Sequence, residues 1–341
     1  MLIRPGALGD VLAVRGVIRL LKDTFPKASL ALAAPGERGR FLCRPGWADQ
    51  AHDWESGAFS WLFSPGGTPP PPALEKVFAG CGWALAYVAT GADAGFPARL
   101  AELAPGAGIL LAPPRPAGGS REKIGARLLR PVLDYCRDAG WLPADFSADL
   151  AGLAAARLKL AGPASGAGKS SLPYAVLHPG SGSGKKNWPL ANYAALGRRL
   201  AAAADPAGRR FFPRLIVTSG EADGDLGQRL AAMLPGAVLA HSPALEELAA
   251  LLAGAALYVG NDSGVSHLAA AVEDAAGRTP EKLVVFGASD PGIWAPPGAR
   301  VMSAGPDMSG LSPETVWTAL AGKRPADPSE PLGTGRPLRT L

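Results

Sequence analysis

Cysteine is scarce in this chain: 341 residues contain three, Cys43, Cys81 and Cys136, and no two of them form a CxxC pair. This excludes a disulfide framework and a structural zinc finger, and it predicts a reducing compartment. No run reaches the ~18 uninterrupted apolar residues of a membrane-spanning helix. Residues 1–20 carry an acid and arginines where a signal peptide needs an apolar core. We therefore expect a cytoplasmic protein, at most peripheral to a membrane.

An excess of one charge is also missing. Lys and Arg number 34 against 29 Asp and Glu, which gives a formal net charge of +5. So small a surplus does not predict the clustered basic face that nucleic acids require, but it fits an anionic substrate or an anionic membrane surface. Hydrophobic residues make up 48% of the chain, which favours folded cores over global disorder. The length fits two domains of roughly 150 residues each.

Strand-like and helix-like segments alternate along the chain, which is typical of α/β folds with parallel sheets. The first half predicts strands at 1–4 and 29–34 and helices at 11–22 and 121–140, whereas residues 72–120 give no clear pattern. The second half predicts strands at 174–177, 214–218, 256–259 and 282–286, with helices at 190–204, 222–234, 245–253, 265–276 and 313–320.

Two halves with this rhythm indicate twin Rossmann-like domains that face each other across a cleft lined by the loops after the strands. The small, proline-bounded residues 161–173 are the expected linker. This gives domains at 1–165 and 170–322 and a disordered tail at 323–341. Residues 166–171 (GAGKSS) look like the end of a P-loop, but Pro163 stands where its first glycine belongs. We interpret them as linker.

The first two loops that follow predicted strands combine glycine with charge. Residues 6–10 (GALGD) open a helix, where glycine lets a ligand approach and the helix N-terminus favours negative charge. Asp10 is there either a functional acid or a helix N-cap. Residues 178–189 (HPGSGSGKKNWP) combine a glycine–serine nest, suited to an oxyanion, with the cations Lys185 and Lys186. The alternative is a flexible loop with two solvated lysines.

The other two loops place polar groups at predicted helix starts. Glu221 either accepts hydrogen bonds from a ribose diol or serves only as a first-turn acid. In residues 260–267 (GNDSGVSH), free N–H groups of Ser263, Gly264 and Val265 would form an anion site suited to a diphosphate. His267 lies one turn further on the face of Ser263, as a site residue or as a satisfied structural histidine.

Taken together, five segments resemble, in the same order, those of the ADP-heptose:lipopolysaccharide heptosyltransferases, glycosyltransferase family 9. They are GALGDVL, HPGSGSGKKNWPLANYAALGRRL, VTSGEADGD, VGNDSGVSHLAAAV and VVFGASDPGIW. The resemblance covers most of residues 1–20 and 174–320, and residues 40–165 only loosely. It implies the GT-B fold of two Rossmann-like domains and an inverting, metal-independent transfer of a heptose or related sugar from an ADP-sugar donor.

The resemblance also implies partners and site residues. The acceptor would be a glycolipid or glycan such as the lipopolysaccharide core, reached at the cytoplasmic face of the inner membrane, and no cofactor is expected. Asp10 would be the general base, Lys186 the phosphate-binding cation and Glu221 the ribose acceptor. The other implied donor-binding positions are glycine, histidine or short polar residues: Gly9, Ser181, Asp262, Ser263, Gly264 and His267. No metal ligand is expected, because the donor loops lack DxD and paired carboxylates.

One departure from the family pattern leaves the acceptor open. The family usually continues GDV with a Thr/Ser-Pro pair in the first helix, beside the acceptor, whereas this chain has Val14-Arg15-Gly16. Two alternatives follow: a GT-B transferase that uses another nucleotide sugar, or a catalytically silent sugar-nucleotide-binding protein in which Arg15 blocks the acceptor. A nicotinamide oxidoreductase is disfavoured, because the first loop lacks GxGxxG.

Overall fold

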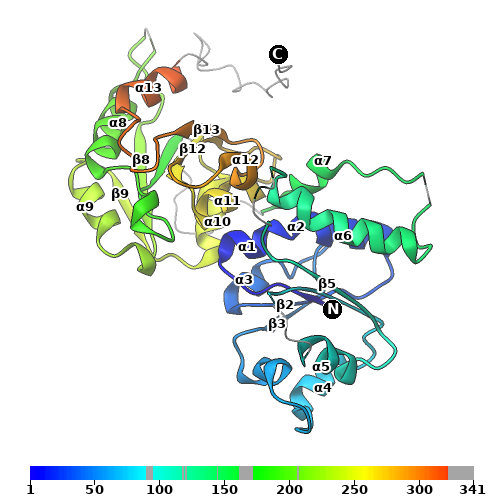
Figure 1. Ribbon diagram of the computed structural model, residues 1–341. Coiled ribbons are helices and arrows are strands. Elements are labelled where there is room, and N and C mark those ends of the chain that lie inside the picture. The colour runs from blue at the N-terminus through cyan, green and yellow to red at the C-terminus, as the bar shows by residue number, and fades with distance from the viewer. Residues whose placement is uncertain are drawn as a thin grey trace.

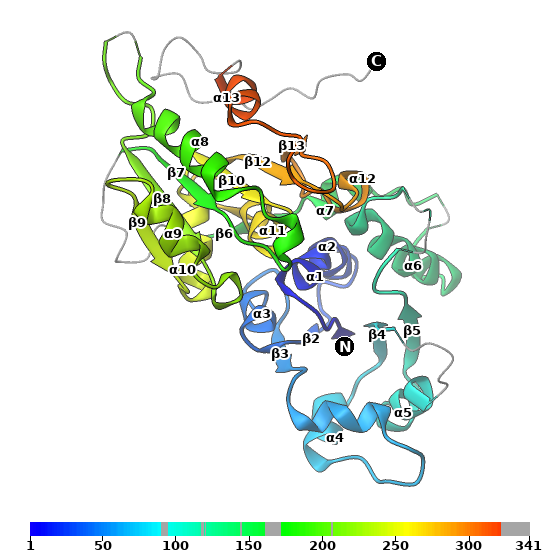
Figure 2. The same cartoon turned by 60° about the vertical axis from the view of Figure 1, so that its left-hand side comes forward.

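The structure, a computed structural model, describes residues 1–89, 95–116, 119, 121–143, 145–160, 172–205 and 207–321. Two parallel sheets with helices packed on them account for most of these residues, one sheet in each half of the chain (Figures 1 and 2). The expected α/β class with parallel sheets is thus confirmed. The predicted linker, the GAGKSS run and the predicted tail lie largely outside the described residues.

The first sheet has five parallel strands in the order β3 (Gln50–Asp53), β2 (Ala31–Ala34), β1 (Leu2–Ile3), β4 (Trp83–Tyr87) and β5 (Gly108–Ala112). One face packs against α1 (Leu8–Ala13), α2 (Arg15–Thr24), α3 (Gly36–Phe41) and α6 (Ile124–Asp138). The other face packs against η1 (Gly57–Phe63), α4 (Pro72–Phe78) and α5 (Gly95–Leu103). Burial on both faces explains the nearly continuous apolar character of the central strands.

The second sheet has six parallel strands in the order β13 (Arg300–Ser303), β12 (Glu281–Phe286), β10 (Leu257–Asn261), β7 (Tyr174–His178), β8 (Arg214–Ser219) and β9 (Val238–His241). Helices α8 (Leu190–Ala202), α9 (Leu226–Ala232) and α13 (Pro313–Ala321) cover one face, and α10 (Leu245–Ala253) and α11 (Gly264–Ala271) the other. Helix α12 (Pro291–Trp294) follows β12. The chain runs outward from β7 in one direction and then from β10 in the other, so the topological switch point, where such sheets bind ligands, lies between β7 and β10.

A single apolar core joins the two halves. It runs from the first sheet through α1, α2 and α6 to α10, α11 and the inner face of the second sheet, and it includes Val17, Leu128, Leu268 and Tyr258, all buried. Helices α1 and α11 lie against each other (Figure 2). The loops that precede these two helices are therefore held close together.

A second connection between the halves is a short parallel pair of strands. After α7 (Leu150–Ala154), β6 (Leu158–Lys159) pairs with β11 (Val272–Glu273), which follows α11. The Leu160 N–H extends the pairing by donating to the Glu273 carbonyl across 2.9 Å. The last described stretch of the first half is thus hydrogen-bonded to the second half.

Several element predictions need correction. The helix expected at 11–22 is interrupted at Val14, where Arg15 Nη1 donates to the Leu12 carbonyl across 2.7 Å and α1 gives way to α2. The helix expected at 265–276 ends at Ala271, because the next two residues pair with β6. The helix expected at 222–234 is a turn followed by α9. The sequence did not predict β3, β4, β5, β9 and β13.

Candidate functional site

The first loop turns sharply between β1 and α1. Gly6 has φ +126°, and a Cβ there would meet Asp10 Cβ at 2.8 Å, so this position favours glycine. Helix α1 begins at Leu8, which places Asp10 at its third position rather than at the N-cap. Its Oδ2 accepts from the Ala7 N–H across 3.1 Å. Asp10 therefore satisfies a free helix donor without being the N-cap that its position in the sequence suggested.

The other oxygen of Asp10 faces Arg4, a residue that the sequence did not single out. Arg4 Nη2 donates to Asp10 Oδ1 across 2.9 Å, and Arg4 Nε donates to the Asp10 carbonyl across 3.0 Å. The Arg4 side chain is 1% exposed, against 20% for Asp10. Burial lowers the pKa of Arg4, while the nearby Asp10 carboxylate acts in the opposite direction. The loop thus presents a partly open carboxylate backed by a buried cation.

The fourth loop forms the start of α11. Ser263 is the N-cap of the helix, and its Oγ accepts from the Ser266 N–H across 3.3 Å. Among the described residues, the N–H groups of Ser263, Gly264 and Val265 have no hydrogen-bond acceptor. Unpaired donors at a helix N-terminus, together with the helix dipole, favour a bound anion.

The structure brings the first and fourth loops into contact through two glycines. A Cβ on Gly264 would meet Leu8 Cβ at 3.0 Å and the Gly9 nitrogen at 3.2 Å. A Cβ on Gly9 would meet His267 Cδ2 at 3.2 Å. Larger residues at either position would separate α1 from α11. Gly9 and Gly264, predicted as donor-binding positions, therefore also set how closely the two halves approach each other.

His267 lies at the centre of the charged groups. It is 9% exposed, and its ring makes no hydrogen bond within the described residues. Burial lowers its pKa to about 4, with Asp262 and Asp10 raising it and Arg15 and Lys186 lowering it further. A neutral imidazole at neutral pH follows. His267 therefore lies where the first and fourth loops meet, since a Cβ on Gly9 would stand 3.2 Å from its ring.

The second loop carries the cation that faces α11. Lys186 lies in a short 3₁₀ turn (Gly184–Lys186), and its Nζ contacts Asp262 Oδ2 across 2.7 Å. Ser289 Oγ donates to the same oxygen across 2.6 Å. Lys185 is exposed and has no ion-pair partner among the described residues. The loop therefore distinguishes its two lysines: one is held beside α11 and the other is solvated.

Ser181 serves the fold of its own loop. Its Oγ lies 2.7 Å from the Ser183 carbonyl and 2.7 Å from Asn187 Oδ1. The side chain is therefore engaged within the loop, where it shapes the backbone between His178 and Trp188. Its contact with the donor stays a prediction.

In the third loop, which follows β8, the predicted residue Glu221 makes no contact with the other predicted site residues. Glu221 is exposed in a 3₁₀ turn (Glu221–Asp223), and its side-chain carboxylate forms no hydrogen bond or ion pair with the described residues. Asp223 turns inward instead: its Oδ2 accepts from the Gly220 N–H across 2.7 Å, and it lies 3.9 Å from His178 Nε2. A Cβ on Gly180 would meet Asp223 Oδ1 at 1.9 Å, so glycine at that position leaves room for this carboxylate.

Arg15 does not present its charge to an open surface. It is 2% exposed, and its Nε donates to the Ala156 carbonyl across 3.0 Å. Burial lowers its pKa to about 10. A Cβ on the adjacent Gly16 would meet the Leu153 carbonyl oxygen at 2.9 Å, so α2 and α7 pack closely here. The unusual Arg15-Gly16 pair therefore fastens residues 153–156 to α2, and an acceptor blocked by an exposed Arg15 is not what the structure shows.

Three residues that matter for this geometry were missed: Arg4, Asp223 and Asn261. Arg4 and Asn261 are polar residues at the carboxyl ends of buried central strands, which is a usable signal in a parallel sheet. Asp223 gave no such signal, because it stands in a turn between two other acids, Glu221 and Asp225.

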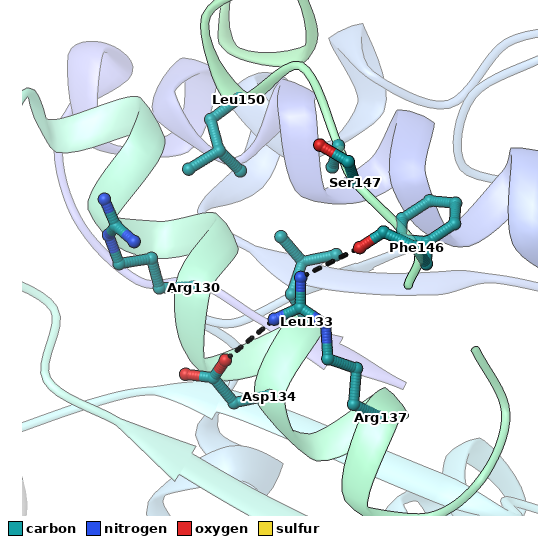
Figure 3. A pocket seen from close by; sticks show the side chains of 8 residues that line it. Arg130, Leu133, Asp134, Arg137, Phe146, Ser147 and Leu150 are labelled. Atoms are coloured by element: carbon teal, nitrogen blue, oxygen red, sulfur yellow. Dashed lines mark hydrogen bonds and ion pairs between the residues drawn. The ribbon is translucent and has the colours of Figure 1, made fainter. Parts of the chain in front are cut away.

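Pockets lie elsewhere on the first half. One of about 160 Å³ separates α6 from residues 146–150 (Figure 3). Arg137 crosses this pocket, and its guanidinium donates to Asp134 and to the Phe146 carbonyl (Figure 3). The guanidinium is therefore already engaged within the fold. The lining of the pocket includes no residue of the four loops. We do not assign the site to this pocket.

Three further observations bear on the expectations from the sequence. Within the described residues, no three His, Cys, Asp or Glu side chains gather as a metal site would require. Over the same part of the chain, no helix is both long and apolar enough to cross a bilayer. All three cysteines lie in described segments and are free thiols.

Known structures share this architecture. The chain is 18% identical to Escherichia coli ADP-heptose lipopolysaccharide heptosyltransferase II (TM-score 0.64), with 94% of this chain and 97% of that chain covered. It is 17% identical to E. coli heptosyltransferase WaaC with ADP (TM-score 0.63), with 94% of this chain and 98% of that chain covered. It is 13% identical to a family 9 glycosyltransferase from Veillonella parvula (TM-score 0.67), with 94% of this chain and 95% of that chain covered. At these identities the likeness shows the fold, which confirms the predicted GT-B type.

Sequence comparison identifies the family. No curated protein matches the chain. The model of glycosyltransferase family 9 (heptosyltransferase) matches residues 127–316, more than half of the chain. That range begins after the GALGD loop and includes Lys186, Glu221 and the start of α11. The family predicted from the motifs is thereby confirmed, and the chain belongs to glycosyltransferase family 9, the heptosyltransferase family, as a glycosyltransferase enzyme.

Proposed function

We propose that this enzyme transfers a heptose, or a related sugar, from an ADP-sugar to the lipopolysaccharide core or a similar surface glycan, with inversion and without a metal. One observation carries the proposal: the contact of Gly9 with His267 and Gly264 sets the Asp10 loop directly against the α11 N-terminus, beside which Asp262 holds Lys186. A base from one half and an anion site from the other thus share one place.

The donor half of this proposal rests on charge. Lys186 and the unpaired N–H groups of Ser263, Gly264 and Val265 offer one cation and three donors to a diphosphate. Such preorganised groups stabilise the negative charge that gathers on a departing diphosphate. We assign the ribose diol to the exposed Glu221. The names of the relatives, one with ADP and one an ADP-heptose transferase, support the choice of ADP as the nucleotide.

The acceptor half rests on Asp10. In the proposed step its carboxylate takes the proton of an acceptor hydroxyl while that oxygen forms a bond to the anomeric carbon. The bond from this carbon to the diphosphate oxygen breaks at the same time, and ADP leaves with the electron pair. General-base assistance of this kind contributes about 10²- to 10⁴-fold. Attack opposite to the leaving group inverts the anomeric centre.

The ion pairs around the site keep these charges compatible. Arg4 balances Asp10, and Asp262 balances Lys186 before the donor arrives. A neutral His267 adds no cation between them. When a diphosphate enters, Lys186 can turn from Asp262 to the phosphate, because its side chain is still 37% exposed.

Acceptor-dependent release of ADP from the full chain tests the function. ADP-heptose should support turnover with a lipopolysaccharide-core acceptor, also in excess EDTA, and UDP- or GDP-sugars should not. Turnover with another nucleotide sugar would replace the donor, and dependence on added magnesium or manganese would contradict metal independence. Binding without any transfer would favour a silent sugar-nucleotide-binding protein. Co-sedimentation with anionic vesicles tests the peripheral contact with the inner membrane that a glycolipid acceptor requires.

A further inference from the structure

The side chain of Asn261 is the most completely bonded polar group near the site. It stands at the carboxyl end of β10 and is 0% exposed. Its Oδ1 accepts from the Trp188 N–H and from the Tyr193 hydroxyl, each across 3.0 Å. Its Nδ2 donates to the Pro179 carbonyl across 2.8 Å and to the Gly180 carbonyl across 3.3 Å. An amide has two donors and two acceptor lone pairs, and all four are used here.

These bonds join both ends of one loop to one strand. Pro179 and Gly180 begin the loop that leaves β7, and Trp188 ends it before α8. Trp188 is itself fixed, since it is 1% exposed and its Nε1 donates to the Leu311 carbonyl across 2.9 Å. Between these anchors lie Gly182 and Gly184, where a Cβ would meet nothing within 4 Å. No side chain packs against the loop at these two glycines, so the position of this stretch depends on the bonds at the loop ends and on the contact of Lys186.

The residue after Asn261 holds the middle of the same loop. Asp262 contacts Lys186 Nζ across 2.7 Å, and the next residue, Ser263, caps α11. Three consecutive residues thus fix the loop ends, the loop cation and the helix whose N–H groups are unpaired. Because all three residues follow one another at the end of β10, this strand end determines how far Lys186 lies from the unpaired N–H groups of α11.

We propose that Asn261 is a positioning residue, which holds the loop of residues 179–188 so that Lys186 and the α11 N-terminus face the same phosphate group. The inference rests on the proposed function, because it takes a nucleoside diphosphate as the ligand. Asn261 has no exposed atom with which to touch the donor. Its effect on binding must pass through the loop, and chiefly through Lys186. A loop already ordered before binding costs less affinity than one that is ordered by the ligand.

The test is a double-mutant cycle in ADP affinity, measured by calorimetry on the full chain. Asn261→Ala should weaken ADP binding by about tenfold or more in the otherwise unaltered chain. In a Lys186→Ala background the same change should weaken binding by less than about twofold, because the side chain through which Asn261 acts is already gone. Tyr174→Phe is the matched control. It removes one half-buried hydrogen bond, to the Leu251 carbonyl across 2.7 Å, at the other end of β7. It should lower stability and leave ADP affinity unchanged.

The outcomes separate the two proposals. Equal losses from Asn261→Ala in both backgrounds, or a loss that Tyr174→Phe reproduces, would show a general stabilising role and overturn the positioning role. If the unaltered chain binds UDP, GDP or CDP instead of ADP, the proposed donor is wrong, and the cycle is run with the diphosphate that binds.

Hydrogen exchange keeps the proposal testable if Asn261→Ala does not fold. In the unaltered, ligand-free chain, the amide of Trp188 should exchange at least about 100-fold more slowly than that of Gly182, since exchange reports local opening. Equal exchange at the two amides would mean that the anchor is not formed before binding, and the inference would fail.

Discussion

The buried guanidinium of Arg4 contacts the carboxylate of Asp10 across 2.9 Å, and the same side chain also donates to the Asp10 carbonyl. Arg4 directly follows the first strand and Asp10 lies in the first helix, so this pair sets the turn between them. A cation that is 1% exposed depends on its partner, because an unpaired buried charge is strongly destabilising. The proposed base is therefore also a structural residue.

Asp10→Asn should for this reason have two effects. Turnover should fall at least about 100-fold, the lower end for loss of a general base. Unfolding free energy should also fall, by about 1–3 kcal/mol, because Arg4 keeps a hydrogen-bond acceptor but loses the charge opposite it. Steady-state kinetics and urea unfolding measure the two effects. Asp23→Asn, which removes the charge from the exposed pair with Arg19, is the control and should change neither. Wild-type turnover in the Asp10 variant would leave the residue with its structural role alone.

Lys186→Ala should weaken ADP binding by about 10- to 100-fold, as expected for a charge-assisted hydrogen bond to phosphate. Lys185→Ala is the matched control, one residue away with the same charge but without a partner among the described residues, and should stay within about twofold. Calorimetry at low salt measures both. Equal losses would indicate a diffuse basic loop rather than one positioned cation.

Gly264→Ala should lower turnover and stability together. The new Cβ would stand 3.0 Å from Leu8 Cβ and 3.2 Å from the Gly9 nitrogen, and a backbone atom cannot turn away as a side chain can. Overpacking of this kind costs about 1–3 kcal/mol. Gly82→Ala, where a Cβ would meet nothing within 4 Å, is the control for thermal unfolding and kinetics. An unchanged melting temperature in the Gly264 variant would contradict the contact between α1 and α11.

His267 predicts a pH dependence of stability. Burial lowers its pKa to about 4 from an ordinary 6.5, so between these values the unfolded chain binds the proton and the folded chain does not. Stability should accordingly decrease as the pH falls from 7 to 4, by on the order of 2–3 kcal/mol from this group. His267→Gln removes the titration. Urea unfolding of both proteins between pH 7 and 4.5 should show a shallower slope in the variant, and parallel curves would refute the assignment.

The sequence predicted the site loops better than their partners. Strand–loop–helix rhythm and short polar motifs placed Asp10, Lys186 and Ser263 at the correct strand ends, because these signals are local. Asn261 was missed because its importance lies in bonds to residues distant in the sequence, and Arg4 because its bonds cross a turn. The roles assigned to the site residues, Asp10 and Lys186 as much as Glu221 and Ser181, stay predictions.

The fold of residues 72–120 was hidden for a different reason. Strand β4 (Trp83–Tyr87, WALAY) is apolar throughout and two of its five residues are alanine, a strong helix former, so such a short apolar run fits a buried helix segment as well as a strand. The end of α11 was misjudged because Val272 and Glu273 leave the helix to pair with β6, a partner more than 100 residues earlier. Pairing between distant segments overrides local propensity in such cases.

The short strand pair β6–β11 also attaches the connecting chain to the second half directly after its attachment to the first half. The Ala156 carbonyl is held from the first half by Arg15, whereas Leu158 and Leu160 are held from the second half by β11. Arg157 alone stands between these two attachments. A rotation of one sheet against the other that leaves both attachments intact would change the backbone dihedral angles around this residue, upstream of the proline-bounded segment that the sequence suggested as the joint.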